Sequence, residues 1–128
     1  MEQLRKALET RDAAAVEALL AEDVVFRSPA LFKPYAGRAA TMVFLRAAME
    51  TFEDFRYLRS YAEDDGRGYV LMFAATVGGR ELEGADFISL DEAGLVSEFR
   101  VMIRPMSGLI ALAEAMAPRV EAAMTALS

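Results

Sequence analysis

The spacing of hydrophobic residues changes from mainly helical to alternating near residue 52, and no other feature limits the fold as strongly. Before this point apolar residues recur three or four apart, as Leu4 and Leu8 do, which is typical of helices that bury one face. After it, apolar and polar residues alternate, which is typical of β-strands. Helices followed by a run of strands predict an α+β fold.

The helical part of the chain contains one expected strand. Asp12 stands where an N-terminal cap is expected, at the start of a second helix. Residues 23–29 are expected to form a short strand that Pro29 ends, because proline lacks the N–H group of a paired strand. A loop follows, and helical spacing returns over residues 39–52. The buried face of the second helix is expected to carry Val16, Leu19 and Leu20.

The alternating part predicts an antiparallel meander, because the segments between its strands are short. Gly78 and Gly79 suit a two-residue hairpin turn, since glycine accepts the positive φ that such turns require. Beyond the meander, residues 107–116 are helical in pattern, and Pro118 is expected to break or restart that helix. The expected strands are residues 54–64, 68–77, 80–90 and 95–105.

Composition excludes several classes of function. Lys and Arg number 14 against 20 for Asp and Glu, a net charge of -6, so we expect no nucleic-acid partner. The chain has no histidine and no cysteine, which removes the commonest general base and the thiolate metal ligands. We expect no metal and no cofactor, and any catalysis must use the remaining polar side chains.

The chain reads as one domain over residues 1–128, since no linker or repeat interrupts it. Its N-terminal segment is charged and lacks the apolar core of a secretion signal. No apolar run reaches the length of a membrane span. We therefore expect a cytoplasmic protein without a membrane partner.

One carboxylate, Asp86, interrupts the apolar pattern of the third expected strand. The two-glycine turn sets Leu71 opposite Asp86, and a four-residue loop over residues 91–94 brings Phe99 opposite Asp86. Because side chains alternate along a strand, both registers place Asp86 on the apolar face of the sheet; a one-residue slip in both hairpins would reverse this. That face is expected to carry Tyr69, Leu71, Phe73, Ala75, Leu82, Ile88, Leu90, Leu95, Ser97, Phe99, Val101 and Ile103.

Two roles are open for Asp86, because burying an unpaired carboxylate is costly. It can be a structural residue that pairs with Arg59 or a tyrosine, or it can be the acid of a pocket. Tyr57 and Tyr61 can supply hydroxyl partners if their strand turns that face inward.

Four segments appear in an order and spacing that resemble a known family: LLAEDVVFRSP, PYAGR, GADFISLDEAGLVSEF and VMIRPMSGL. They are similar to the SnoaL-like branch of the nuclear transport factor 2-like superfamily, which also contains ketosteroid isomerases, scytalone dehydratase and limonene epoxide hydrolase. The resemblance implies a cone-shaped α+β barrel. In such a barrel a strongly curved antiparallel sheet wraps around N-terminal helices and encloses an internal pocket.

The resemblance also implies a role for Asp86 and removes its usual partners. Asp86 aligns with the oxyanion-hole aspartic acid of ketosteroid isomerases, a carboxyl that stays neutral so that it can donate a hydrogen bond. Ser28 stands at the position of the general-base aspartate, and Leu4 at that of the helix tyrosine. Steroid isomerisation by that mechanism is therefore not expected, and the catalytic sets of the related hydrolases and dehydratases are absent too.

We expect a protein that binds a small apolar molecule in its pocket. If it is an enzyme, it is a cofactor-free isomerase, cyclase, lyase or hydrolase of a polyketide-, steroid- or terpenoid-like metabolite, with Asp86 as the acid or base. A non-catalytic binding module, or an interaction domain whose pocket is filled, stays open as an alternative. The expected ligand contacts are Phe26, Ser28, Phe32, Tyr35, Tyr57, Tyr61, Leu71, Phe73, Phe99 and Val101.

The opposite face of the sheet mixes charged and apolar residues. Such a face is too apolar for open solvent, and proteins that resemble this one usually pair through it, so we expect a homodimer. Its charged residues are Glu81, Glu83, Glu98, Arg100 and Arg104, and its apolar residues are Val70, Met72, Phe87, Val96 and Met102.

Overall fold

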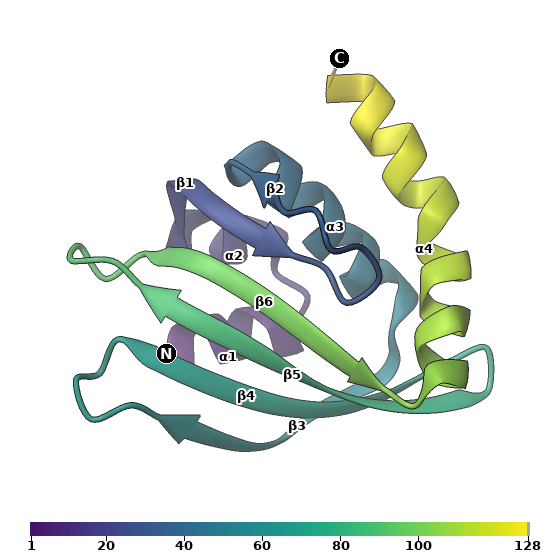
Figure 1. Cartoon of the computed structure of the whole chain (residues 1–128), viewed down its shortest axis with the longest axis horizontal. Helices are drawn as coiled ribbons and strands as arrows, with labels where there is room; N and C mark the ends of the chain where they lie inside the picture. The colour runs from purple at the N-terminus through teal and green to yellow at the C-terminus, as the bar shows by residue number, and fades with distance from the viewer. Residues whose placement is uncertain (128) are drawn as a thin grey trace.

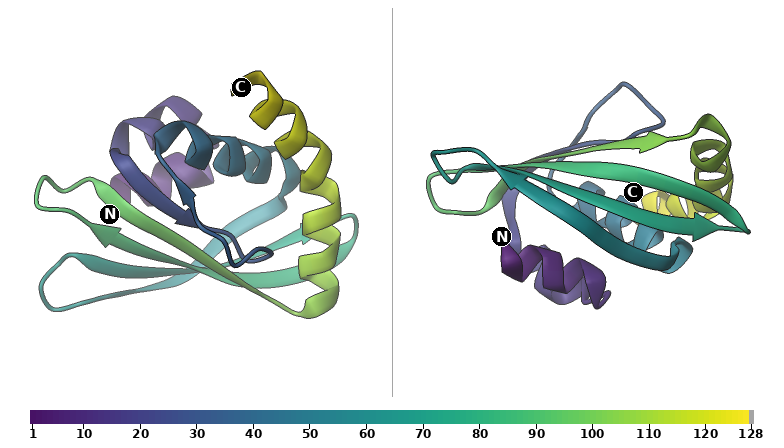
Figure 2. Two further views of the ribbon diagram at one scale, coloured as in Figure 1. Left: turned by 45° about the horizontal axis from the view of Figure 1, so that its top comes forward. Right: turned by 90° about the horizontal axis from the view of Figure 1, so that it is seen from below.

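A curved, six-stranded sheet forms the centre of the structure, a computed structural model that describes residues 1–127 (Figure 1). Figure 2 shows α1, α2 and α3 on one side of the sheet and α4 standing across one end of it. In chain order the elements are α1 (Glu2–Glu9), α2 (Ala13–Leu19), β1 (Leu20–Arg27), β2 (Tyr35–Ala36), α3 (Arg38–Thr51), β3 (Glu53–Ala62), β4 (Gly68–Val77), β5 (Arg80–Leu90), β6 (Val96–Arg104) and α4 (Met106–Leu127).

The strands lie in the order β2-β1-β6-β5-β4-β3, and β2 and β3 form the two edges of an unclosed sheet. Strands β3 to β6 make the expected antiparallel meander. The pair β1 and β6 is parallel instead, because no hairpin joins these two strands and none sets their relative direction. The α+β class, with a curved sheet around N-terminal helices, is thereby confirmed.

Local chemistry explains two of the predicted boundaries. The N–H group of Ala15 donates to Asp12 Oδ1 over 3.1 Å, so Asp12 is the N-terminal cap of α2 as expected. Gly78 and Gly79 both have positive φ, 56° and 79°, in the turn between β4 and β5.

Two helix boundaries differ from the expectation. Leu20 begins β1 rather than lying on the face of α2, yet it is buried in the core. Its side chain is therefore buried as expected, although it belongs to a strand and not to the helix. Helix α4 continues through Pro118. One turn is weakened by the missing N–H, but Arg119 anchors the next turn to α3 through Glu50 at 3.3 Å and through the Thr51 hydroxyl at 3.3 Å.

The register of the last hairpin corrects the prediction. Asp86 pairs with Val101, and Phe99 lies opposite Ile88, two positions away from the expected partner. The turn is one residue longer than assumed, because Leu90 pairs with Val96, and a bulge lies between this pair and the pair Ser89–Glu98. Because the total shift is two residues, Asp86 keeps its predicted face. Val96 lies opposite Leu90 and is buried, so it belongs to the core and not to the outer face.

The core lies between the concave face of the sheet and the helices. Hydrophobic side chains from β4, β5 and β6 meet those of α1, α2 and α3 there, which is how an α+β fold buries one face of its sheet. Among residues 1–127 no helix is long and apolar enough to cross a membrane. The largest fully buried side chains are Phe73, Phe99, Leu20, Met42, Leu71, Leu82, Ile88, Val16, Val24, Val96 and Thr41.

Candidate functional site

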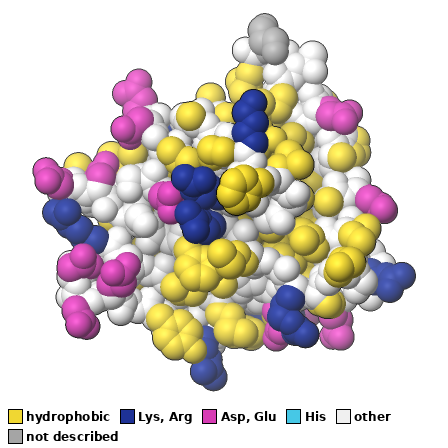
Figure 3. Space-filling view, viewed as in Figure 1, with side chains coloured by type: hydrophobic (Ala, Val, Ile, Leu, Met, Phe, Trp, Pro, Cys, Tyr) yellow, Lys and Arg dark blue, Asp and Glu magenta, His cyan; other side chains and the backbone are white. Residues whose placement is uncertain are grey.

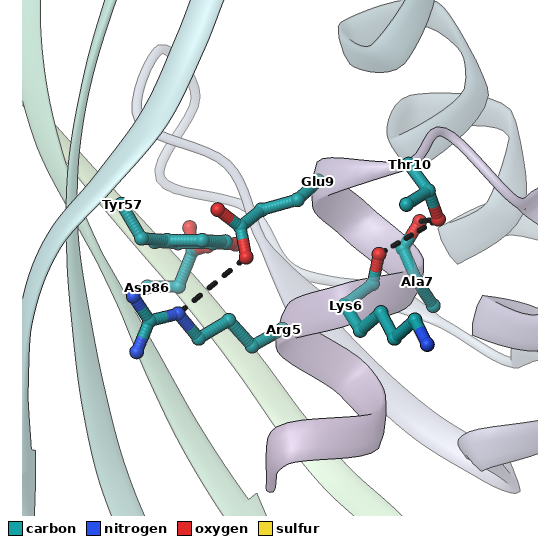
Figure 4. Close-up of polar contacts among 7 residues, drawn as sticks. All are labelled: Arg5, Lys6, Ala7, Glu9, Thr10, Tyr57 and Asp86. Carbon is teal, nitrogen blue, oxygen red and sulfur yellow. Dashed lines mark hydrogen bonds and ion pairs between the residues drawn. The ribbon is translucent and has the colours of Figure 1, made fainter.

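Asp86 is a carboxyl on the apolar face of β5, and its side chain is only 5 % exposed. Its neighbours across the sheet are Leu71 on β4 and Val101 on β6. The hydroxyl group of Tyr57, on β3, donates to Asp86 Oδ2 over 2.9 Å. Figure 4 shows the two side chains close together, beside α1.

Burial controls the charge of this pair. Removal from water raises the pKa of Asp86 to about 7, although the hydrogen bond from Tyr57 acts in the opposite direction. Burial, followed by the neighbouring Asp86 charge, raises the pKa of the Tyr57 hydroxyl well above its usual value. Near neutral pH the site therefore holds a substantial fraction of neutral carboxyl, which is able to donate a hydrogen bond.

A cavity of about 580 Å³ lies beside Asp86, between the sheet and the helices. Its wall is formed mainly by apolar side chains from β1, α3, β4, β6 and α4, and Met116 and Val120 bring the second half of α4 into it. A volume of this size falls within the range of about 300–1,000 Å³ that is typical of small-molecule sites. The carboxyl side chains that line it are Glu9, Asp54, Asp86 and Glu121.

Most of the residues singled out from the sequence lie together in this cavity. Asp86 and Tyr57 are among its polar residues. Phe26 stacks on Phe44 of α3 with ring centroids 5.2 Å apart, and the Tyr35 ring is tilted against Phe44 at 4.4 Å. The predicted contacts found in the lining are Phe26, Ser28, Tyr35, Tyr57, Phe73, Phe99 and Val101.

Three predicted contacts lie outside the cavity lining. Phe32 is fully exposed in the loop between β1 and β2. Tyr61 is 54 % exposed and belongs to the outer side of the sheet, because a bulge in β3 changes the alternation after Tyr57. Leu71 is buried in the core and packs there without reaching the cavity surface.

Of the two structural partners expected for Asp86, Arg59 is wrong and a tyrosine is confirmed, because Asp86 accepts a hydrogen bond from Tyr57. Arg59 points to the outside, where its guanidinium donates to the Tyr61 hydroxyl over 3.3 Å. Ser28 serves the loop that follows β1, since its hydroxyl oxygen accepts from the N–H groups of Ala30 and Leu31 at 3.1 Å and 3.0 Å. A hydroxyl oxygen that is held in this way is a turn-forming group rather than a proton acceptor for a ligand.

Sequence reasoning missed Glu9, a carboxyl of α1 that lines the cavity. Its Oε1 lies 3.5 Å from Arg5 Nε, and the Arg5 guanidinium lies 5.8 Å from the centre of the Tyr57 ring. Figure 4 shows both side chains reaching from α1 toward Tyr57 and Asp86. The available signal was its place next to Leu8, at the edge of the buried stripe of the first helix.

Comparison with known proteins agrees with the fold. The family model described as a SnoaL-like domain matches residues 1–99. The crystal structure of a steroid delta-isomerase from Pseudomonas aeruginosa is 44 % identical, with 97 % of this chain and 90 % of that chain covered and a TM-score of 0.90.

Two further solved structures are similar. An uncharacterised protein with a cystatin-like fold from Silicibacter pomeroyi is 35 % identical, with 92 % of this chain and 82 % of that chain covered and a TM-score of 0.87. An epoxide hydrolase/cyclase-like enzyme of pyran ring formation in the polyether salinomycin shares the fold at 21 % identity, with coverages of 84 % and 88 % and a TM-score of 0.65. No curated protein gives a significant match.

Proposed function

Because the chain belongs to the SnoaL-like domain family, we propose that it binds a small, largely apolar carbonyl compound between its sheet and helices. In this proposal the neutral carboxyl of Asp86 donates a hydrogen bond to the carbonyl oxygen. Tyr57 holds the other carboxyl oxygen through its own hydroxyl, at 2.9 Å. The ligand is thus oriented by one polar contact within an apolar wall.

The observation that supports this most directly is the buried, raised-pKa carboxyl beside a cavity of about 580 Å³. A perturbed acid in an apolar pocket is the usual mark of a functional group. The similar protein from Pseudomonas aeruginosa is described as a steroid delta-isomerase, which favours a steroid-like ligand over the polyketide-like and terpenoid-like ones. Asp86 would then act as the acid that stabilises an enolate oxygen.

A non-catalytic binding module is the second candidate. It is favoured by Ser28, which stands in place of a base and is engaged in its own loop by Ala30 and Leu31. The two candidates share the same ligand contact at Asp86, so a binding measurement tests what they have in common.

The test is to titrate the protein with androst-4-ene-3,17-dione by calorimetry, at pH 6 and at pH 8.5. If only the neutral carboxyl binds, the dissociation constant should rise roughly 30-fold between these values, because the competent fraction falls as Asp86 ionises. Asp86→Asn keeps a donor and should bind equally well at both values. Asp86→Leu should bind about tenfold more weakly than Asp86→Asn.

Tyr61→Phe is the matched control, since it removes a hydroxyl group on the outside of the sheet and should leave the affinity unchanged. Absence of binding by the wild-type protein, or an affinity that neither pH nor Asp86→Leu changes, would contradict the proposed function.

We also propose that the outer face of the sheet pairs with a second copy of the chain. Val70, Phe87 and Arg100 form one row across β4, β5 and β6, while Met72 and Met102 flank Ala85 in the next. Figure 3 shows this side of the molecule, with hydrophobic side chains gathered over the strands among charged ones. Within the described residues, the buried Nε of Arg100 has no hydrogen-bond partner, which also favours an interface.

A further inference from the structure

We infer that Glu9 is a second functional carboxyl of the site and acts as the proton-transferring base, with Asp86 as the acid. The inference rests on the proposed function, because it requires a carbonyl compound bound at Asp86. It assigns the site a 1,3-proton shift on a ketone whose α-carbon carries an acidic hydrogen. The base comes from α1, not from the strand end where Ser28 stands.

The position of Glu9 is set by the packing of α1. Leu4 and Leu8 are buried against the core, and Glu9 follows Leu8 directly, so its side chain leaves the helix at the border of the buried face. There it lines the same cavity as Asp86. Its negative charge is close enough to contribute to the raised pKa of Tyr57, and Figure 4 shows its carboxylate directed at that side chain.

The surroundings of Glu9 differ from those of Asp86 in the way an acid and a base require. Asp86 is enclosed and its one hydrogen-bonding partner among the described residues is the neutral hydroxyl of Tyr57. The Glu9 side chain is 39 % exposed, and its carboxylate lies 3.5 Å from the positively charged Arg5 guanidinium. Two carboxyls held in such different environments take opposite roles in proton transfer.

The remaining cavity carboxyls are less suited to this role. Asp54 is paired with Arg56 at 3.3 Å and its side chain is mostly exposed. Glu121 lies on the second half of α4. Of the acidic side chains that line the cavity, Glu9 and Asp86 are the two whose charges act on Tyr57.

The proton shift requires no further reactant. Glu9 takes a proton from the α-carbon, the C–H electron pair forms a new C=C bond, and the carbonyl π-electrons move to oxygen, where the Asp86 O–H group stabilises the charge through its hydrogen bond. With a β,γ-unsaturated ketone, Glu9 then returns the proton to the γ-carbon. The conjugated ketone forms, and both carboxyls end in their initial states.

The experiment uses androst-5-ene-3,17-dione and follows the conjugated ketone by its ultraviolet absorbance. Glu9→Gln should lower kcat at least 100-fold, the usual contribution of a general base, with KM and the affinity for androst-4-ene-3,17-dione changed less than threefold. Glu17→Gln is the matched control. It removes another Glu–Arg ion pair of 3.5 Å, with Arg46, at a position outside the cavity lining, and should leave kcat unchanged.

Arg5→Gln separates catalysis from helix stability. It removes the Arg5–Glu9 ion pair but leaves the Glu9 carboxylate in place. It should retain far more activity than Glu9→Gln. A second readout is the exchange of α-hydrogens of androst-4-ene-3,17-dione in D₂O, followed by NMR, which wild type should accelerate and Glu9→Gln should not.

The outcomes distinguish the two claims. If wild type binds androst-4-ene-3,17-dione but neither isomerises nor exchanges, or if Glu9→Gln keeps wild-type kcat, the role of Glu9 is wrong and the binding function stands. If wild type does not bind the steroid at all, the proposed function fails and the inference about Glu9 fails with it.

Discussion

Asp86 shows how the surroundings of one residue set its chemistry. A carboxyl on a strand is ordinarily charged and exposed, yet this one lies among Leu71, Val101 and the other side chains of the apolar face. Tyr57 supplies a hydrogen bond but no compensating positive charge. Burial therefore outweighs the hydrogen bond, and the pKa rises to about 7 from the ordinary value of 3.8.

This residue makes stability depend on pH in a predictable direction. Since the folded-state pKa is the higher one, the folded protein binds the extra proton, and stability falls as pH rises from about 4 to about 7. Above pH 7, ionised Asp86 lowers the free energy of unfolding by on the order of 4 kcal/mol. Between pH 5 and pH 8, Asp86→Asn should gain roughly 2.5 kcal/mol in unfolding free energy relative to wild type, measured by urea denaturation.

Tyr57→Phe tests the cause of this effect. The Tyr57 hydroxyl lowers the pKa of Asp86. Without this hydroxyl, the pH range over which stability falls should extend above pH 7. A difference between Asp86→Asn and wild type that is the same at pH 5 and pH 8 would rule out a buried, titrating Asp86.

At the scale of elements, the pairing of β4, β5 and β6 decides what faces the cavity. Phe73 lies opposite Gly84, and the ring occupies the space over the glycine. The bulge between β5 and β6 shifts Phe99 away from Asp86 and brings Val101 there. Gly84 and the bulge thus determine which side chains form the sheet side of the cavity. Glycines and bulges are common in curved sheets.

Gly84→Ala should destabilise the protein by about 1–3 kcal/mol, the usual cost of overpacking. The new Cβ would meet the end of the Phe73 ring and, at 2.8 Å, the carbonyl oxygen of Met102. Thermal or urea unfolding measures the loss. In a double-mutant cycle, Phe73→Leu should partly relieve it, and strictly additive effects would show that the ring contact is not the cause.

At the scale of the whole molecule, helices cover the concave face of the sheet and leave the other face uncovered. Figure 1 shows α1 to α3 behind the strands and α4 at one end, so the outer face has no helix of its own. Met102, on this face, is 52 % exposed. An apolar, uncovered sheet face of this kind is where a second copy is expected to dock.

Met102→Glu should convert the proposed dimer into a monomer at micromolar concentration, because the new carboxylate would lose its water in the interface. Light scattering after size exclusion gives the mass. Leu127→Glu is the control, as it changes an exposed leucine near the far end of α4. A wild-type protein that is monomeric throughout would contradict the proposed assembly.

The sequence by itself determined the order of the elements, except for β2 within the expected loop, and the face on which Asp86 lies. Strand alternation has a period of two, so even a hairpin register that was wrong by two residues left Asp86 on the apolar face. The cap at Asp12 and the turn at Gly78 were likewise readable, because both depend only on neighbouring residues.

Only the tertiary structure decided which groups meet at the site. Glu9 and Tyr57 belong to elements far apart in the chain, and no local pattern reports that α1 lies over β3. The exposed position of Phe32 and the outward turn of Tyr61 depend on loop path and on a bulge. The raised pKa of Asp86 follows from the depth of its burial, a property that exists only once the helices have covered the sheet.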